Sequence, residues 1–212
     1  MKKKLVKELQ DSYKLCYTNI SQILNSSTLS DNEKILNLKH ISYLIKNDIK
    51  YDYLSRLLYT KLMKKEHLEQ KHKLQNNYSV LTSRFITEDF KEINLKEDIC
   101  ISCPYIFSKF TSNNITIKNK GFVYHNNNHY AYYYTGIDIT IIINGFHSCS
   151  SGILQGGKIL ARVVDVLYDD IEVNNSGEYT TCNGDVLGRD FDIRFTILYK
   201  LNKEILKLNK EK

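Results

Sequence analysis

The sequence predicts an α+β fold, in which an N-terminal helical segment packs on, or is linked to, a mostly antiparallel β-sheet domain. In the first 90 residues, apolar side chains recur at three- and four-residue steps, which is the spacing of one helical face. Residues 91–200 instead contain short runs of Ile, Val, Tyr, Phe and Thr between clusters of Asn, Gly, Ser and Asp. Helices followed by strands indicate segregated layers. We therefore expect a basic helical region at 1–90, a β-rich domain at 91–200 and a short C-terminal helix or tail at 201–212.

The helical region divides into about three predicted helices. The first covers residues 3–24 and ends at a polar Asn-Ser-Ser sequence. Ser30 and Glu33 have the spacing of a capping box, which predicts the start of a second helix. We expect Asn47-Asp48 to break this helix, and a third helix to follow at 51–68.

The β-rich region begins after a weakly patterned segment, in which residues 87–90 favour one more short helix. Residues 152–158 are interpreted as a flexible hairpin or bulge because they are rich in glycine. The predicted strands share β-branched and aromatic residues and lie at 99–106, 115–117, 121–125, 130–143, 158–168, 171–173 and 192–199.

Positive charge is concentrated at the N-terminus. The whole chain has a net charge of +6. Residues 1–73 alone contain 15 Lys and Arg against 8 Asp and Glu, a net of +7. Such a surface attracts nucleic acid by neutralising phosphates, so DNA is one predicted partner. The alternatives are a lysine-rich solvated surface, and helices that bind a protein partner or form a homo-oligomer.

Nothing in the composition predicts export or a membrane segment. The longest apolar run, Ile139–Ile143, is far shorter than the roughly 20 residues needed to cross a bilayer. Glu8 and Gln10 interrupt any apolar core of a signal peptide. Five cysteines are an odd number for a disulfide framework, which favours reduced thiols. We therefore expect a cytoplasmic protein that does not enter a membrane.

Cys100 and Cys103 have the Cys-x-x-Cys spacing of half a zinc site. A structural zinc site needs a second pair, and neither His147 with Cys149 nor Cys182 supplies a clean one. The spacing therefore predicts two ordinary strand cysteines, no metal and no cofactor.

The tyrosine-rich run at 130–134 is the most informative part of the chain. Side chains alternate along a strand, so Tyr130, Tyr132 and Tyr134 are expected on one face and Tyr133 on the other. Such a row is suited to stacking on a nucleobase. On residue types alone, however, the row favours a cross-strand aromatic ladder that stabilises a sheet.

The run Tyr130–Ile137, followed about twenty residues later by Lys158–Val164, resembles the alkyladenine (3-methyladenine) DNA glycosylase family. That family has a Tyr-x-Tyr-x-x-Tyr-Gly strand, a short polar loop and a strand reading roughly Val-Leu-Ile-Arg. The similarity covers about 45 of the 212 residues. It implies a curved antiparallel sheet with a pocket for an extruded base.

The resemblance also implies roles for individual residues. Tyr130 and Tyr132 correspond to pocket residues, and Arg162 to a residue that contacts DNA or supports the sheet. His125, just before the run, is a further candidate contact with nucleic acid. The strand that carries the family's catalytic glutamate is absent. Three acids lie at a suitable spacing to activate a water and are the catalytic candidates: Asp138, Glu97 and Asp98.

Two functional hypotheses follow. The first is a glycosylase-like, nucleic-acid-binding protein that excises a damaged base, as a DNA-repair hydrolase, or merely holds it. The second is a non-enzymatic interaction or structural protein, with a helical region for partner docking and an aromatic β core. The sequence leaves the question of enzymatic activity open.

Overall fold

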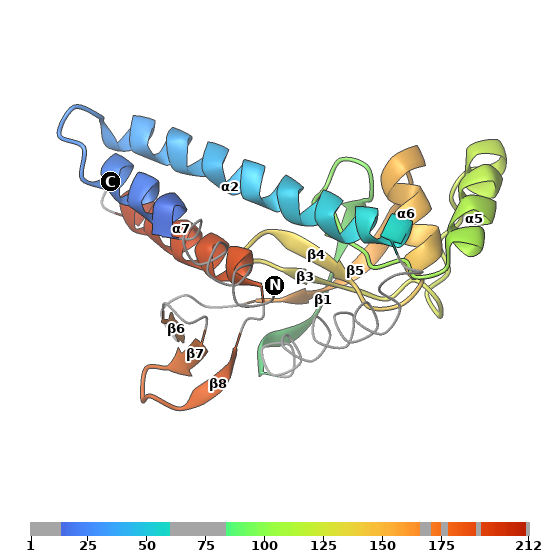
Figure 1. Cartoon of the computed structure of the whole chain (residues 1–212). Helices are drawn as coiled ribbons and strands as arrows, with labels where there is room; N and C mark the ends of the chain where they lie inside the picture. The colour runs from blue at the N-terminus through green and yellow to red at the C-terminus, as the bar shows by residue number, and fades with distance from the viewer. Residues whose placement is uncertain (1–13, 60–83, 166–170, 175–177, 190–191, 211–212) are drawn as a thin grey trace.

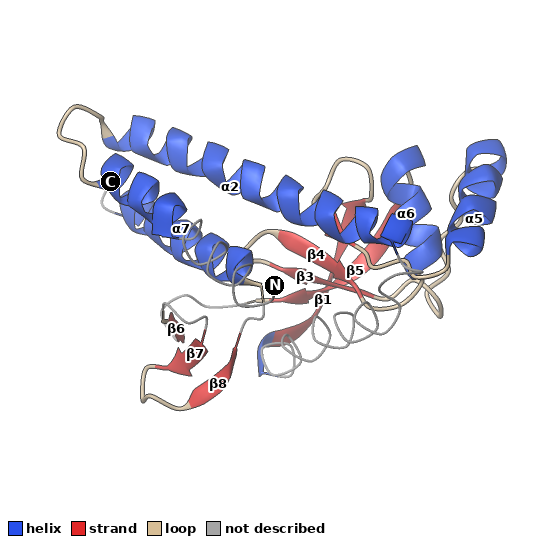
Figure 2. Ribbon diagram, viewed as in Figure 1, coloured by secondary structure: helices blue, strands red, loops and turns tan. Residues whose placement is uncertain are grey.

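The computed structural model describes residues 14–59, 84–165, 171–174, 178–189 and 192–210. It confirms the predicted α+β class. A long helix, α2, lies across one face of a five-stranded sheet, and a second, three-stranded sheet lies below α7 in the view of Figure 1. Figure 2 shows that helices and strands alternate through the second half of the chain rather than forming a continuous β region.

The helices in the described part of the chain have the following bounds. They are α2 (Asp31–Ser55), α5 (Phe107–Lys120), α6 (Phe146–Gln155) and α7 (Ile193–Lys210), with a 3-10 turn, η1 (Arg56–Tyr59), directly after α2. Residues 14–24 are also helical. This agrees with the predicted end of the first helix, whose residues 3–13 lie outside the described residues.

The five-stranded sheet is mixed and has the order β1-β5-β3-β4-β2. Its strands are β1 (Ile86–Asn94), β2 (Cys100–Ile101), β3 (Ala131–Tyr134), β4 (Ile139–Ile142) and β5 (Lys158–Val164). The pairs β1/β5 and β3/β4 are antiparallel, whereas β3/β5 and β2/β4 are parallel. The small sheet is antiparallel and contains β6 (Ile171–Val173), β7 (Glu178–Thr181) and β8 (Val186–Arg189).

The start of α2 is predicted correctly, but its break is not. The Ser30 side chain accepts from the Glu33 N–H, and the Glu33 carboxylate accepts from the Ser30 N–H at 2.9 Å, which is the complete capping box. The helix then continues through Asn47-Asp48 to Ser55. Within the helix, the Asn47 side-chain amide donates to the carbonyl of Tyr43 at 2.9 Å. Its weak helix propensity costs less than about 0.7 kcal/mol, and tertiary packing outweighs that cost. Residues 60–68 of the predicted third helix lie outside the described residues.

Several predicted strands are wrong. Residues 115–117 lie within α5, and residues 192–199 lie mostly within α7. The first turns of α7 are buried on nearly all sides, from Phe195 to Tyr199. Such a continuous apolar run cannot be distinguished from a buried strand by periodicity. Residues 121–125 are irregular, and only Cys100–Ile101 of the strand predicted at 99–106 is formed.

The secondary structure of two further segments also differs from the prediction. Residues 87–90 form part of strand β1 rather than a short helix, and residues 152–155 of the predicted hairpin or bulge form the end of helix α6. The run 130–143 folds as a hairpin of β3 and β4 with a turn at 135–138. Strand β6 matches its prediction, and β5 matches residues 158–164 of the strand predicted at 158–168.

Helix α2 supplies part of the main hydrophobic core. Ile49 and Tyr53 are fully buried in the same cluster as residues of the large sheet, of α6 and of α7. A second cluster joins the first half of α2 to the last turns of α7 through Leu38, Leu201 and Ile205. The helical region is therefore structurally continuous with the sheet that it covers.

We expect Ile49→Ala to lower the free energy of unfolding by about 2–5 kcal/mol, because it leaves a cavity between α2 and the sheet. Urea unfolding measures this loss. Leu154→Ala, at an exposed position on α6, is the control and should change stability by less than about 0.5 kcal/mol. Equal effects of both substitutions would contradict the assignment of Ile49 to the core.

Candidate functional site

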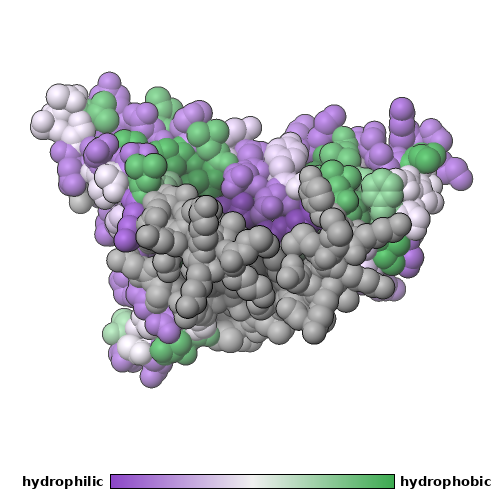
Figure 3. All heavy atoms as spheres, viewed as in Figure 1, coloured by the Kyte–Doolittle hydropathy of each residue, from purple (hydrophilic) through white to green (hydrophobic). Residues whose placement is uncertain are grey.

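A pocket of about 480 Å³ lies between α2, α7 and the five-stranded sheet. This volume falls in the range of small-molecule sites. The residues that line it are mostly polar or charged: Lys39, Ser42, Tyr43, Lys46, Lys91, Glu97, Asp98, Ile99, Tyr133, Asp138, Thr140, Asn202 and Ile205. In the space-filling view, hydrophilic side chains occupy the middle of the molecule and are flanked by more hydrophobic areas (Figure 3).

The polar wall of the pocket comes from an unusual stripe on α2. Ser42, Lys46 and Lys50 follow one another at four-residue steps, so they lie on one side of the helix. All three are buried. Lys50 donates to the backbone carbonyl of Asp98 at 2.9 Å, and burial lowers the pKa of its ammonium group. The side of α2 that meets the edge of the sheet therefore carries ammonium groups rather than methyl groups.

Asp138 is the shared partner of charged and hydroxyl groups in the lining of the pocket. Its carboxylate accepts from the Lys46 ammonium at 3.0 Å and from the Tyr133 hydroxyl at 2.8 Å. The Lys91 ammonium lies 4.0 Å from the same carboxylate and 3.6 Å from the centre of the Tyr133 ring. Asp138 thus occupies the space between two cations that come from α2 and β1.

The backbone at Asp138 is held in the left-handed region, with φ of 50°. It is the last residue of the turn between β3 and β4, and Asp tolerates this conformation better than most residues. Asn202 of α7 donates to the carbonyl of Gly136 in the same turn at 2.8 Å. The turn is therefore anchored to both α2 and α7, which positions the carboxylate.

The ammonium group of Lys46 is only partly satisfied. The Lys46 side chain is 10% exposed, and Asp138 is its hydrogen-bond partner among the described residues. An ammonium group has three donors, and Lys46 also lines the pocket, so a ligand there would find a nearly buried cation with one partner among the described residues. Lys39 stands at the rim and is exposed.

The three predicted catalytic acids all line this pocket, but their carboxylates differ in their contacts and exposure. The Asp138 carboxylate accepts from Lys46 and Tyr133. Asp98 accepts from the backbone N–H of Asn94 at 2.7 Å, so its carboxylate holds the turn after β1. Glu97 is exposed. The pocket therefore offers Asp138 and Glu97 as acceptors for a ligand, and Asp98 mainly as a structural group.

The predicted nucleic-acid contacts lie elsewhere. Tyr132 and Tyr133 are consecutive in β3 and so project from opposite faces of the sheet. Tyr133 faces the pocket, whereas Tyr132 shares the other face with Tyr130, whose ring lies edge-on at 6.1 Å between centroids. Arg162 is the register partner of Tyr132, and its Nε donates to the Thr87 carbonyl at 2.9 Å.

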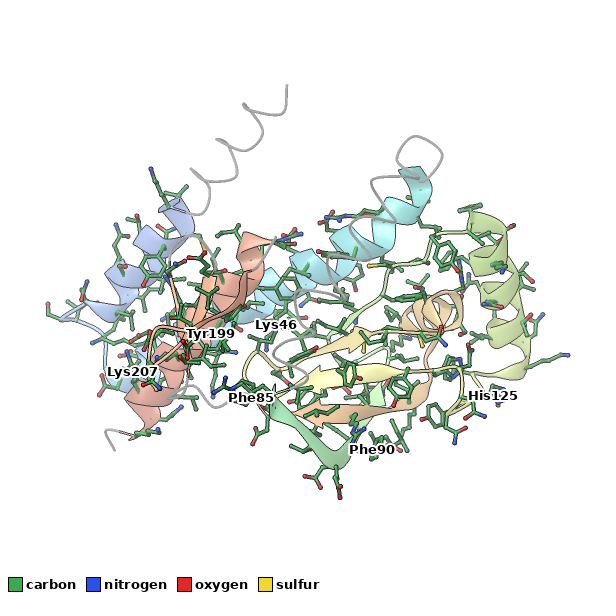
Figure 4. All side chains as sticks on the ribbon, turned by 90° about the horizontal axis from the view of Figure 1, so that it is seen from below. Lys46, Phe85, Phe90, His125, Tyr199 and Lys207 are labelled. Atoms are coloured by element: carbon green, nitrogen blue, oxygen red, sulfur yellow. The ribbon has the colours of Figure 1, made fainter. Side chains whose placement is uncertain are left out.

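The structure thus separates the candidate acids from the candidate tyrosines. Figure 4 shows Lys46 on α2, Phe90 on the edge strand β1 and His125 near α5, in three different parts of the molecule. Tyr134, expected beside Tyr130 and Tyr132, is buried in the core.

His129 and Ser148 form a second polar contact that resembles a nucleophile and its base. The His129 Nε2 lies 2.9 Å from the Ser148 Oγ. However, His129 Nδ1 accepts from the His125 N–H at 3.0 Å, and Ser148 donates its proton to the Gly145 carbonyl at 3.0 Å. His129 Nε2 must therefore carry the proton and donate to Ser148. A histidine in this state cannot take a proton from the serine, so the contact is structural.

The cysteines show no arrangement suited to metal binding. Cys100 and Cys103 are both buried, and burial raises the pKa of the Cys100 thiol to about 12. Within the described ranges, no group of three or more His, Cys, Asp or Glu side chains is placed to hold a metal ion.

We did not identify Lys39, Lys46, Lys91 or Tyr133 as site residues from the sequence. One signal was present. Ser42 and Lys46 interrupt the apolar face of a helix whose neighbouring positions, Ile35, Leu38 and Ile49, are buried. A lysine at such a position needs a partner. The partner, Asp138, is 92 residues away in the chain, so only the fold reveals the contact.

The fold and this pocket define an α+β protein with a polar, ligand-sized cavity under its longest described helix. The chain belongs to DUF6710, a family of unknown function whose model matches residues 2–212. No curated protein and no solved structure matches the chain. None of the helices in the described segments is both long enough and apolar enough to span a membrane.

The buried His129 predicts a pH dependence of stability. Burial, together with nearby His125, lowers the pKa of His129 below its ordinary value of 6.5. The unfolded chain therefore binds the proton more readily than the folded one. The stability contributed by neutral His129 is present above about pH 6.5 and is lost as the pH falls below that value.

We expect wild type to lose more unfolding free energy between about pH 7.5 and 5.5 than the His129→Gln variant, measured by urea unfolding. His40→Gln, at an exposed position on α2, should keep the wild-type dependence. An unchanged dependence in His129→Gln would show that other groups control acid stability.

Proposed function

We propose that this protein binds a small organic phosphate with hydroxyl groups, such as a sugar phosphate or a mononucleotide, in the pocket beneath α2. The observation that carries the proposal is the Lys46 ammonium, which lines the pocket, is nearly buried and has Asp138 as its hydrogen-bond partner among the described residues. A buried charge without enough partners is costly. A phosphate oxygen accepts such donors well, and lysine is a common phosphate ligand.

The surrounding charges support an anionic group bound in the pocket. Lys39, Lys46 and Lys91 supply three cations from two elements. Asp138 lies between Lys46 and Lys91 as an internal anion, and its side chain is 59% exposed. A bound phosphate would compete with this carboxylate for the ammonium groups of Lys46 and Lys91.

Other lining residues suit the neutral part of such a ligand. Glu97 and Asn202 offer oxygen acceptors for hydroxyl groups, and the exposed Tyr43 ring offers a surface for a sugar or a base. The volume of about 480 Å³ accommodates a mononucleotide but not a segment of duplex.

A second candidate function is the holding of single-stranded nucleic acid on the opposite face of the sheet. Phe90, Arg162 and Tyr132 form one row across β1, β5 and β3, because Arg162 is the register partner of both aromatic residues. Phe90 and Tyr130 are exposed on this face. Aromatic rings with a neighbouring guanidinium are typical of surfaces on which bases stack.

This second candidate is binding without cleavage. Asp138 and Glu97 line the pocket on the other face, so they cannot act on a base stacked on Tyr130 or Tyr132. Glu88 and Asp89 are exposed on β1 and disfavour a nearby phosphate backbone. Base excision stays a prediction of the family resemblance alone.

For the first proposal, we expect wild type to bind ribose 5-phosphate and AMP in isothermal titration calorimetry, and ribose not at all. Lys46→Met should weaken binding at least about tenfold, because it removes the main phosphate donor. Asp138→Asn should strengthen it, because Lys46 and Lys91 lose their internal anion.

The control for this experiment is Lys203→Met. Lys203 is partly buried and paired with Glu172 at 2.7 Å, but it lies outside the pocket. The Lys203→Met variant should bind ribose 5-phosphate and AMP with the affinity of wild type. No binding of either phosphate to wild type at about 1 mM, or equal weakening by both lysine substitutions, would contradict the proposal.

For the second candidate, Tyr130→Ala should weaken binding of single-stranded oligonucleotides by about fivefold to a hundredfold, the worth of one stacked base. Fluorescence anisotropy measures the affinity. Tyr105→Ala, at a comparably exposed ring, is the control. Because acidic residues flank the row, we expect a shallow dependence on salt. A steep dependence that survives Tyr130→Ala would place binding on the lysines of the helices instead.

A further inference from the structure

Thr140 lines the pocket, and its hydroxyl has no hydrogen-bond partner in the described part of the chain. The residue belongs to β4 and is only 1% exposed. Its backbone N–H donates to the Ile99 carbonyl at 2.9 Å. Buried polar groups usually have a partner, and an unpaired one needs an explanation. Because Thr140 borders a pocket, a bound ligand can supply the missing partner.

The register of the sheet places Thr140 beneath α2. Thr140 pairs with Tyr133 across β3 and β4, and directly opposed residues project from the same face of a sheet. The Tyr133 hydroxyl donates to Asp138, which also accepts from Lys46. Thr140 therefore lies on the pocket side of the sheet, next to the contacts that hold Lys46.

Two groups on α2 share this shortage of partners. Ser42 is 4% exposed, and its hydroxyl donates to the Asn202 side chain at 3.4 Å, which is long for such a bond. Lys46 has one hydrogen-bond partner among the described residues, Asp138, for three donors. Ser42, Lys46 and Thr140 are thus three buried groups of the lining that can all donate to a ligand.

The remaining polar groups of the lining differ in their exposure. Lys39, Tyr43, Glu97 and Asp138 are exposed. Because solvent reaches these residues and scarcely reaches the three buried donors, the buried donors lie deeper in the pocket. The aromatic ring of Tyr43 and the Glu97 carboxylate lie nearer to solvent.

We propose that the pocket selects terminal phosphate groups, and that Thr140 determines this specificity by donating its hydroxyl to a phosphate oxygen beside Lys46. This inference rests on the proposed function and specifies which organic phosphates are accepted. A terminal phosphate is attached through one oxygen, so its other oxygens can reach the buried donors while the sugar or base stays near the exposed residues. A phosphodiester is attached on two sides and cannot enter in this way.

The first test compares AMP with 3′,5′-cyclic AMP on wild type by isothermal titration calorimetry. The two ligands share a base and a sugar, but the phosphate of the cyclic compound is a diester. We expect AMP to bind at least about tenfold more tightly, and inorganic phosphate to compete with it. Equal affinities for AMP and the cyclic compound would overturn the proposal.

The second test removes the hydroxyl at nearly constant shape with Thr140→Val. Binding of AMP should weaken at least about fivefold, and the preference over cyclic AMP should shrink, which a difference in ligand charge alone does not predict. Thr140→Ser retains the hydroxyl and should bind AMP within about twofold of wild type.

Thermal unfolding of the ligand-free protein separates ligand binding from a structural role. Because an unpaired buried hydroxyl is unfavourable, Thr140→Val should raise the midpoint by about 2 °C or more. Thr181→Val is the matched control. The Thr181 hydroxyl is buried outside the pocket and accepts from the Asp185 N–H at 3.1 Å. Its loss should lower the midpoint and leave AMP binding unchanged.

The outcomes distinguish this inference from the proposed function. If Lys46→Met weakens AMP binding and Thr140→Val does not, the phosphate lies away from Thr140. That result refutes the inference and leaves the proposed function standing. A lower midpoint for Thr140→Val also refutes it, because the hydroxyl then has a partner in the ligand-free protein. Absence of phosphate binding to wild type refutes both.

Discussion

The burial of lysine side chains along one side of α2 is the constraint on which the rest of the structure depends. Lys46 and Lys50 are nearly inaccessible, so each ammonium group needs oxygen atoms within reach. Lys50 obtains them from the turn after β1, and Lys46 from Asp138 in the turn between β3 and β4. These two turns therefore have to lie beneath α2. The pocket occupies the space that remains between the turns, where apolar contacts would otherwise close the layer.

Helix α7 completes the arrangement through polar contacts at its beginning and middle. Arg194 pairs with Asp48 and Asp52 of α2 at 2.7 and 2.6 Å, and with Asp192 at 2.7 Å. Asn202, one of the pocket residues, reaches the Gly136 carbonyl. Although exposed ion pairs contribute little, this cluster is partly buried and networked, so it restricts how α7 lies along α2. The pocket is thus defined by directional contacts, and a change in one wall is transmitted to the others.

Local signals in the sequence predicted part of this fold well and part of it poorly. The capping box at Ser30 depends on residues three positions apart and was predicted correctly. The first turns of α7 were predicted as a strand, because a segment buried on all sides loses the helical period. The three acids predicted as catalytic line one pocket without Tyr130 and Tyr132, the tyrosines predicted beside them, and Lys46 was missed because its partner is distant in the chain. Alternation predicted that Tyr132 and Tyr133 face opposite ways, but not which of them would meet α2.

Helix α2 therefore has two different sides with two different chemistries. Its inner side carries the polar stripe of Ser42, Lys46 and Lys50 beside buried apolar residues, and its outer side carries exposed leucines and tyrosines among polar residues. A buried ammonium group and an exposed apolar side chain both cost stability in water. The proposed ligand anion would offset the first of these costs, because its oxygen atoms accept from ammonium groups that line the pocket. The polar stripe therefore has two consequences: it fixes the turns that lie beneath α2, and it supplies the charge on which the proposed binding depends.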